Sequence, residues 1–118
     1  MDILELQHRL RQFAAERDWE KFHSPKNLAM ALSVEAAELL ERFQWLTELE
    51  SYELRDRPED YDAVADELAD VQIYLLRLAD KLSIDLPSIV ERKMQRNAEK
   101  YPVHLARGNS VKYNRRKV

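Results

Sequence analysis

LAMALSVEAAELLERFQW, residues 28–45, is an apolar segment that also carries two glutamates. Its large apolar side chains recur every three or four positions, which is typical of an α-helix. Between positions 28 and 40 only Ser33, Glu35 and Glu38 are polar. An ionised carboxylate in apolar surroundings costs on the order of several kcal/mol unless a partner compensates its charge. The segment therefore predicts a helix whose two acids need a positive partner.

Start and stop signals around this segment predict four helices. Ser24 and Pro25 are typical of an N-cap and a first helical residue, so the helix with the two glutamates is expected over residues 25–43. Four helices joined by short links favour an all-α four-helix bundle, with residues 1–102 as one domain. The other three helices are expected to begin after Asp2, Pro58 and Asp85, and the last of them to end before Pro102.

Two segments lie outside the expected helices. Residues 46–57 are polar and acidic with weak periodicity, and we expect a loop there with at most one helical turn. Residues 103–118 form a basic tail that contains the single glycine, Gly108, and that is expected to be largely extended. The helix over residues 25–43 is apolar on more sides than a small bundle covers, so we expect a second subunit to bury part of it.

The composition excludes several classes of protein. The chain has 118 residues with one glycine and four prolines, which disfavours a turn-rich β architecture. It contains no cysteine, so disulfides and thiolate metal sites are excluded. A formal net charge of −3 gives no reason to expect a nucleic-acid partner. Apolar runs of about 18 residues are absent, and residues 1–24 lack an apolar signal segment, so we expect a cytoplasmic protein without a membrane partner.

A second acid pair lies on the helix that is expected after Pro58. Relative to the apolar stripe of that helix, Glu67 lies roughly 60° to one side and Asp70 roughly 120° to the same side. Glu35 and Glu38 have the same offsets, roughly 60° and 120°, from the stripe of their own helix. Each pair alone would fit a solvated helix edge. Two pairs with matching offsets indicate that adjacent helices bring four carboxylates to one place.

Four carboxylates in one place need a positive ion. They repel one another and raise each other's pKa values unless a cation lies between them. The cluster offers oxygen ligands only, which favours a hard ion such as Mg²⁺, or Mn²⁺ as its substitute. The coordination of such an ion is commonly completed by substrate phosphates, so the cluster predicts a phosphate-containing substrate.

These residues also carry a family resemblance. The segments FHSPKNLAMALSVEAAELLERFQW (residues 22–45) and DELADVQIYLLRLADKL (residues 66–82) resemble the MazG-like all-α nucleoside triphosphate pyrophosphohydrolases. The signature of that family is Glu-x-x-Glu on one helix and Glu-x-x-Asp on another. The likeness is strongest to its dCTP pyrophosphatase branch, and it extends through FAAERDWEKFH (residues 13–23), DLPSIVERKMQRNAEKYP (residues 85–102) and HLARGNSVKY (residues 104–113).

The resemblance implies a four-helix bundle that assembles into homodimers or homotetramers. It also implies Mg²⁺-dependent cleavage of a nucleoside triphosphate, dCTP or a modified dCTP, to the monophosphate and pyrophosphate, as a house-cleaning enzyme of the nucleotide pool. The metal ligands would be Glu35, Glu38, Glu67 and Asp70, with Glu38 and Glu67 as the catalytic acids, and the basic tail would lie over the active site. Substrate contacts would come from Trp19, His23, Lys26, Trp45, Tyr74, Lys93, Asn97 and Tyr101.

Other functions remain open at this point. The acids would equally form the binding face of a non-catalytic helical interaction module, and the related phosphoribosyl-ATP pyrophosphohydrolases are a third possibility. A di-iron carboxylate bundle needs two Glu-x-x-His motifs that face its core. The spacing occurs at Glu5–His8 and at Glu20–His23. The first pair lies opposite the apolar face of its helix and the second precedes Pro25, so we set the di-iron reading aside.

Overall fold

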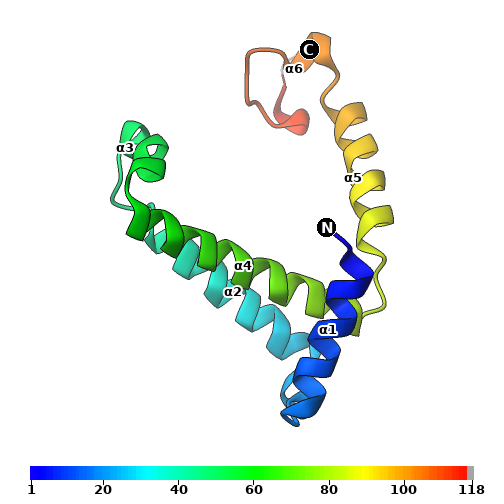
Figure 1. Ribbon diagram of the computed structural model, residues 1–118. Helices are drawn as coiled ribbons and strands as arrows, with labels where there is room; N and C mark the ends of the chain where they lie inside the picture. The colour runs from blue at the N-terminus through cyan, green and yellow to red at the C-terminus, as the bar shows by residue number, and fades with distance from the viewer. Residues whose placement is uncertain (117–118) are drawn as a thin grey trace. The chain divides into compact units, whose positions relative to one another are not determined.

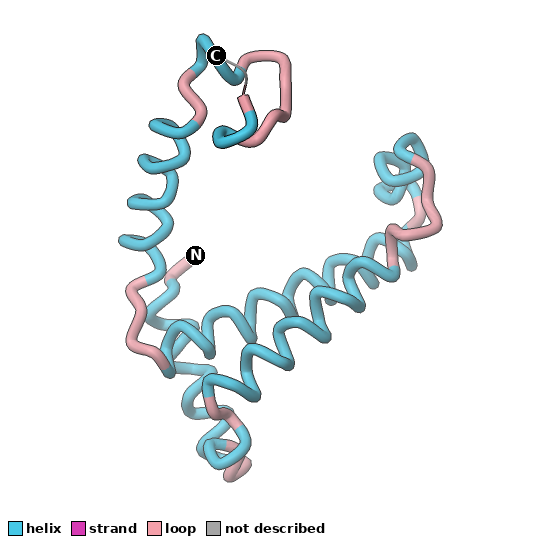
Figure 2. The backbone as a smooth tube through the Cα atoms, turned by 180° about the vertical axis from the view of Figure 1, so that it is seen from behind, coloured by secondary structure: helices cyan, strands magenta, loops and turns pink. Residues whose placement is uncertain are grey.

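The computed structural model describes residues 1–116, and no strand occurs within them (Figure 2). The chain therefore belongs to the all-α class, as the sequence predicts. It divides into two compact units, residues 1–83 and the part from Ile84 onward. The first unit contains three of the four long helices that the sequence predicts, and the second contains the fourth. A closed four-helix bundle stays a prediction.

The first two long helices begin where the sequence places them. Helix α1 spans Ile3–Glu16, and the Asp2 carboxylate accepts a hydrogen bond from the Glu5 amide at 3.0 Å. Helix α2 spans Pro25–Glu41, with the Ser24 hydroxyl accepting from the Asn27 amide at 3.1 Å. These caps satisfy amides that have no partner within the helix. Helix α2 ends two residues before the expected end at Phe43.

Helix α4 (Pro58–Lys81) is the longest element among residues 1–116, and both other long helices of the first unit contact it. Helices α2 and α4 run side by side, and α1 packs against α4 as well (Figure 1). Leu28 and Leu76 are fully buried in this core. The buried Gln7 of α1 donates a hydrogen bond to the Leu76 carbonyl at 3.1 Å, which satisfies its amide.

Much of α2 stays uncovered in the first unit. Met30, Val34 and Leu40 keep 56%, 56% and 59% of their surface exposed. Exposed apolar faces of this kind mark interaction surfaces in soluble proteins. The expected second subunit on α2 remains a prediction.

The segment over residues 46–57 is more helical than expected. It forms α3 (Glu48–Tyr52) and a 3₁₀ helix, η2 (Glu53–Asp56), where we expected a loop with at most one helical turn. A capping box causes this: the Thr47 hydroxyl accepts from the Glu50 amide at 3.1 Å, and the Glu50 carboxylate accepts from the Thr47 amide at 3.0 Å. Leu54 is buried and anchors the segment.

The second unit is built on α5 (Leu86–Lys100), which Asp85 caps by accepting from the Ser88 amide at 3.5 Å. The tail after it is not extended as expected, because it contains α6 (Val103–Ala106) and the 3₁₀ helix η3 (Tyr113–Arg115). The Tyr113 amide donates to the Tyr101 hydroxyl at 3.3 Å, which returns the tail to the end of α5. The last two residues of the predicted tail, 117 and 118, lie outside the described residues.

None of the helices within residues 1–116 combines the length and the apolar character needed to cross a bilayer.

Candidate active site

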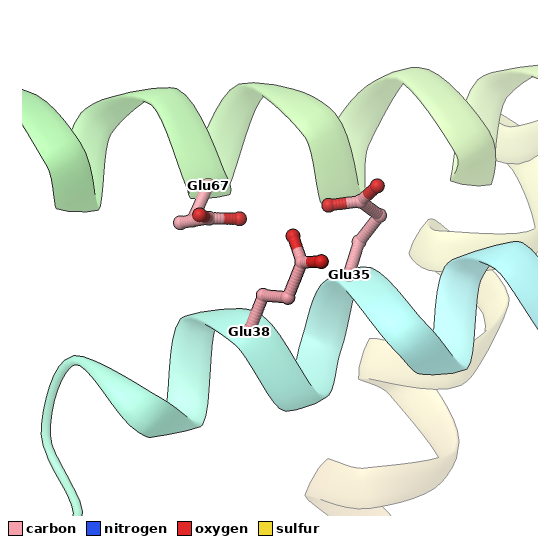
Figure 3. A group of neighbouring side chains, drawn as sticks. All are labelled: Glu35, Glu38 and Glu67. Atoms are coloured by element: carbon pink, nitrogen blue, oxygen red, sulfur yellow. The ribbon is translucent and has the colours of Figure 1, made fainter.

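Three of the four predicted acids meet between α2 and α4. Glu35 and Glu38 point from α2 toward α4, and Glu67 points from α4 toward α2 (Figure 3). One carboxylate oxygen from each residue lies within 4.8 Å of the other two. All three side chains are half-buried. The angular offsets read from the sequence therefore identify side chains that converge.

The cluster is short of positive charge. The Oε2 atoms of Glu35 and Glu67 are buried, and neither has a hydrogen-bond partner among residues 1–116. Among residues 1–116, Arg42 is the cation that pairs with the cluster, and its Nη2 lies 3.9 Å from Glu67 Oε1. A buried carboxylate oxygen without a partner is costly, so native structures usually supply one. The unpaired oxygens are what a bound cation would compensate.

The shortage of positive charge also affects the pKa values of Glu35 and Glu67. Burial raises the pKa of Glu35 to about 7, helped by the close approach of Glu38 and by the charges of Glu38, Asp70 and Glu67. Burial also raises the pKa of Glu67, and the charge and close approach of Glu38 add to this effect, while the charge of Arg42 opposes it. Such mutual elevation is the expected electrostatic signature of carboxylates that share a site without a cation.

Asp70, the fourth predicted acid, is not one of the three converging residues. It lies one turn after Glu67 on α4, and its side chain is one methylene shorter than that of a glutamate. Its charge nevertheless raises the pKa values of Glu35 and Glu67. Its role as a metal ligand stays a prediction.

Asp70 also borders a cavity of about 350 Å³ between α1, the η1 segment (Glu20–Phe22) and α4. This volume lies in the range of small-molecule sites. The cavity brings together three predicted substrate contacts, which are Trp19, His23 and Tyr74. A larger cavity of about 730 Å³ lies between α1 and α4, but its lining is mostly apolar and includes none of the four acids. The smaller cavity is therefore the better candidate for substrate.

The other predicted contacts are spread over the chain. Lys26 is exposed on the first turn of α2, and Trp45 follows α2 with 86% of its surface exposed. Lys93, Asn97 and Tyr101 belong to the second unit, on α5 and at its C-terminal end. Their roles as substrate contacts stay predictions.

Sequence reasoning missed two arginines near these groups. Arg42 lies beside Glu67, and Arg77 lines the smaller cavity. The signal for Arg77 is its spacing: it follows Tyr74 by three residues and Asp70 by seven, so the three share one face of α4. For Arg42, four residues after Glu38, the signal is the i,i+4 spacing on one helix face.

Comparison with known protein families matches residues 30–115 to the MazG-like family. The chain belongs to the MazG-like family. Among curated proteins, this MazG-like chain is 50% identical to dCTP pyrophosphatase 1 of Homo sapiens and 49% identical to that of Rattus norvegicus, each over 102 residues. Each alignment covers 86% of this chain and 60% of the relative, so the chain spans about three fifths of the length of these relatives.

A solved structure is similar in fold as well as in sequence. A pyrophosphatase from Archaeoglobus fulgidus is 46% identical to this MazG-like chain, with a TM-score of 0.79. The match covers 86% of this chain and 94% of that protein. The family resemblance that the sequence suggests is thereby confirmed.

The raised pKa of Glu35 predicts how stability changes with pH when no divalent ion is present. The folded protein holds the Glu35 proton up to about pH 7, whereas the unfolded chain releases it near 4.5. Ionising Glu35 between these values therefore destabilises the folded state of the wild type. We expect Glu35→Gln to match wild type near pH 4 and to exceed its free energy of unfolding near pH 8, by on the order of 1–2 kcal/mol after solvent screening.

Urea denaturation in EDTA at several pH values measures this difference. Glu41→Gln is the matched control, since Glu41 is an exposed acid on the same helix. A stability difference between Glu35→Gln and wild type that does not change from pH 4 to pH 8 would show that Glu35 is not held in a shared acidic site.

Proposed function

We propose that this chain hydrolyses a nucleoside triphosphate, dCTP or a modified dCTP, to the monophosphate and pyrophosphate, with a divalent ion held by the acid cluster. The observation that carries the proposal is the convergence of Glu35, Glu38 and Glu67 with two buried oxygens unpaired among the described residues. Relatives named dCTP pyrophosphatase 1 and a solved pyrophosphatase, all more than 45% identical over 86% of the chain, support the reaction and the base.

The donor set fits a hard divalent ion. Glu35, Glu38 and Glu67 offer carboxylate oxygens only, and the unpaired Oε2 atoms of Glu35 and Glu67 are ready acceptors of positive charge. Such a set suits Mg²⁺, or Mn²⁺ as its substitute, with Asp70 as the fourth ligand. When bound, the ion would supply charge for the phosphate oxygens and would acidify a water.

The side chains of this chain divide the remaining work. Glu38 would orient the attacking water and accept its proton. Glu67 would contribute its negative charge to the cluster from α4. The water oxygen forms a bond to the α-phosphorus, and the bond from that phosphorus to the bridging oxygen breaks to release pyrophosphate. Trp19, His23 and Tyr74 would hold the base in the adjacent cavity. Further contacts are assigned to Lys26, Trp45, Lys93, Asn97 and Tyr101.

The functional form would be a homodimer or homotetramer. The apolar side chains Met30, Val34 and Leu40 on α2 are more than half exposed in the single chain. A second copy that covers them would stabilise both chains by removing this surface from water.

A panel of deoxy- and ribonucleoside triphosphates with Mg²⁺ tests the proposed reaction. We expect dCTP and modified dCTP to give the highest kcat/KM, with pyrophosphate and not orthophosphate as the inorganic product. In water enriched in ¹⁸O, the label should enter the monophosphate, because the new bond forms at the α-phosphorus. Label in pyrophosphate would contradict attack at that atom. Hydrolysis of phosphoribosyl-ATP alone would favour a phosphoribosyl-ATP pyrophosphohydrolase. Hydrolysis of no nucleotide would favour a non-catalytic helical interaction module.

A further inference from the structure

Arg77 of α4 is a buried cation that none of the steps above uses. Only 2% of its surface is exposed, although it borders the smaller cavity. Its guanidinium has partners on two elements. Nη2 lies 2.8 Å from Glu20 Oε1 and 3.3 Å from His23 Nδ1, Nε lies 3.4 Å from the same ring nitrogen, and Nη1 lies 3.5 Å from Asp80 Oδ2.

These contacts fix the state of the His23 ring. Arginine donates hydrogen bonds and accepts none, so His23 Nδ1 must be the unprotonated, accepting nitrogen. A neutral ring then carries its hydrogen on Nε2. Burial and the charge of Arg77 lower the pKa of His23, against the opposing charge of Glu20. The ring is therefore held neutral at physiological pH.

The other charged groups around the ring are paired among themselves. Glu20 also pairs with Lys81, and Asp80 also pairs with Arg11 of α1 at 3.0 Å. The network ties α1 and the η1 segment to α4, and both carboxylate partners of Arg77, Glu20 and Asp80, are shared with a second cation. The Nε2–H of His23 is the ring donor that these contacts leave for a ligand.

The cavity that His23 borders suits a flat ring. Trp19 lies beside it with 42% of its surface exposed, and its indole packs edge-on against Phe13 at 5.7 Å between centroids. The His23 ring follows at 6.3 Å from Trp19. Aromatic walls with one fixed donor select a heteroaromatic ring that carries a hydrogen-bond acceptor, such as a carbonyl oxygen or an unprotonated ring nitrogen.

We propose that Arg77 is a positioning residue for nucleobase recognition: it holds His23 as a neutral ring whose Nε2–H is offered to an acceptor on the base. This inference rests on the proposed function, since it assigns the base to this cavity. The guanidinium nitrogens of Arg77 already donate to Glu20, His23 and Asp80, so its effect on the base would pass through His23.

Arg77→Met compared with Asp80→Asn tests the proposal in the full-length chain. Methionine removes the charge and the donors at similar length, whereas Asp80→Asn disturbs the same network away from His23. We expect Arg77→Met to raise KM for the preferred nucleotide about tenfold with kcat changed less than twofold, and Asp80→Asn to leave both within twofold. Equal effects of the two variants would reduce Arg77 to a structural role and overturn the proposal.

NMR titration of the histidine rings provides a readout that needs no nucleotide. The chain has three histidines, and loss of one signal in His23→Gln assigns the ring. We expect the titration midpoint of His23 to rise in Arg77→Met, because the cation is gone while Glu20 remains, and to stay unchanged or fall slightly in Asp80→Asn. An unchanged titration midpoint of His23 in Arg77→Met would show that Arg77 does not control the His23 ring. That result would overturn the proposal whatever the nucleotide assays show.

A second pair of variants covers the case in which Arg77→Met does not fold. His23→Gln keeps an amide that both accepts from Arg77 and donates to a base, whereas His23→Phe keeps neither. We expect KM to rise less than threefold in the first and about tenfold in the second. An equal rise of KM in His23→Gln and His23→Phe would overturn the proposal that His23 donates a hydrogen bond to the base. If wild type hydrolyses no nucleotide, the proposed function fails, while the NMR titration still decides whether Arg77 controls the ring.

Discussion

Glu38→Gln and Glu67→Gln are each expected to lower kcat by roughly 10²–10³-fold while the protein stays folded. Each change removes one negative charge from a cluster in which one carboxylate oxygen of each residue lies within 4.8 Å of the others. The pKa values of Glu35 and Glu67 in this cluster are already raised. In both variants the site then binds a divalent ion less tightly, and Glu38→Gln also loses the base that would orient water. Because buried repulsion is relieved, the melting temperature in EDTA should be equal to that of wild type or higher.

Pyrophosphate release at saturating nucleotide and Mg²⁺ measures the loss, and circular dichroism melting confirms the fold. Asp66→Asn is the matched control, since Asp66 is an exposed acid next to Glu67 on the same helix. Turnover at the wild-type rate in both glutamine variants would mean that the cluster is not catalytic. The acids would then be the binding face of an interaction module.

The long helices follow from local signals in the sequence. Asp2, Ser24 and Asp85 accept hydrogen bonds from the amide three residues later, as residues of these types do at N-caps. The convergence of Glu35 and Glu38 on Glu67 follows from helical geometry alone once two apolar stripes are packed face to face. Helix boundaries and the direction of a side chain are local properties, so one sequence is enough to read them.

Other features depend on information that a periodic pattern does not carry. The Thr47–Glu50 capping box turns a polar stretch into α3, although that stretch lacks an apolar stripe. Angular offset gives the direction of Asp70 but not the reach of its side chain, and Asp70 is not among the three converging acids. The spacing of Arg77 places it on the face of α4 that carries Tyr74 and Asp70, but its burial and its contacts with His23 and Glu20 appear only in the folded chain.

Removal of divalent ions should have the largest effect of all. We expect chelation by EDTA to lower the rate of nucleotide hydrolysis by roughly 10³-fold or more, because the phosphates would then face unneutralised carboxylates. Mg²⁺ or Mn²⁺ should restore the rate. Either ion should also raise the melting temperature without nucleotide, since it binds the folded cluster and not the unfolded chain.

Binding of the ion should release protons, and this distinguishes the proposed cluster from a surface site. With a pKa of about 7, Glu35 is about half protonated at pH 7 and must lose that proton to act as a ligand. Calorimetric titrations with Mn²⁺ in two buffers of different ionisation enthalpy should therefore report about half a proton released per site, and less in Glu35→Gln. Binding that stabilises the protein but releases no proton would place the ion away from Glu35, and full activity in EDTA would exclude a divalent ion from the reaction.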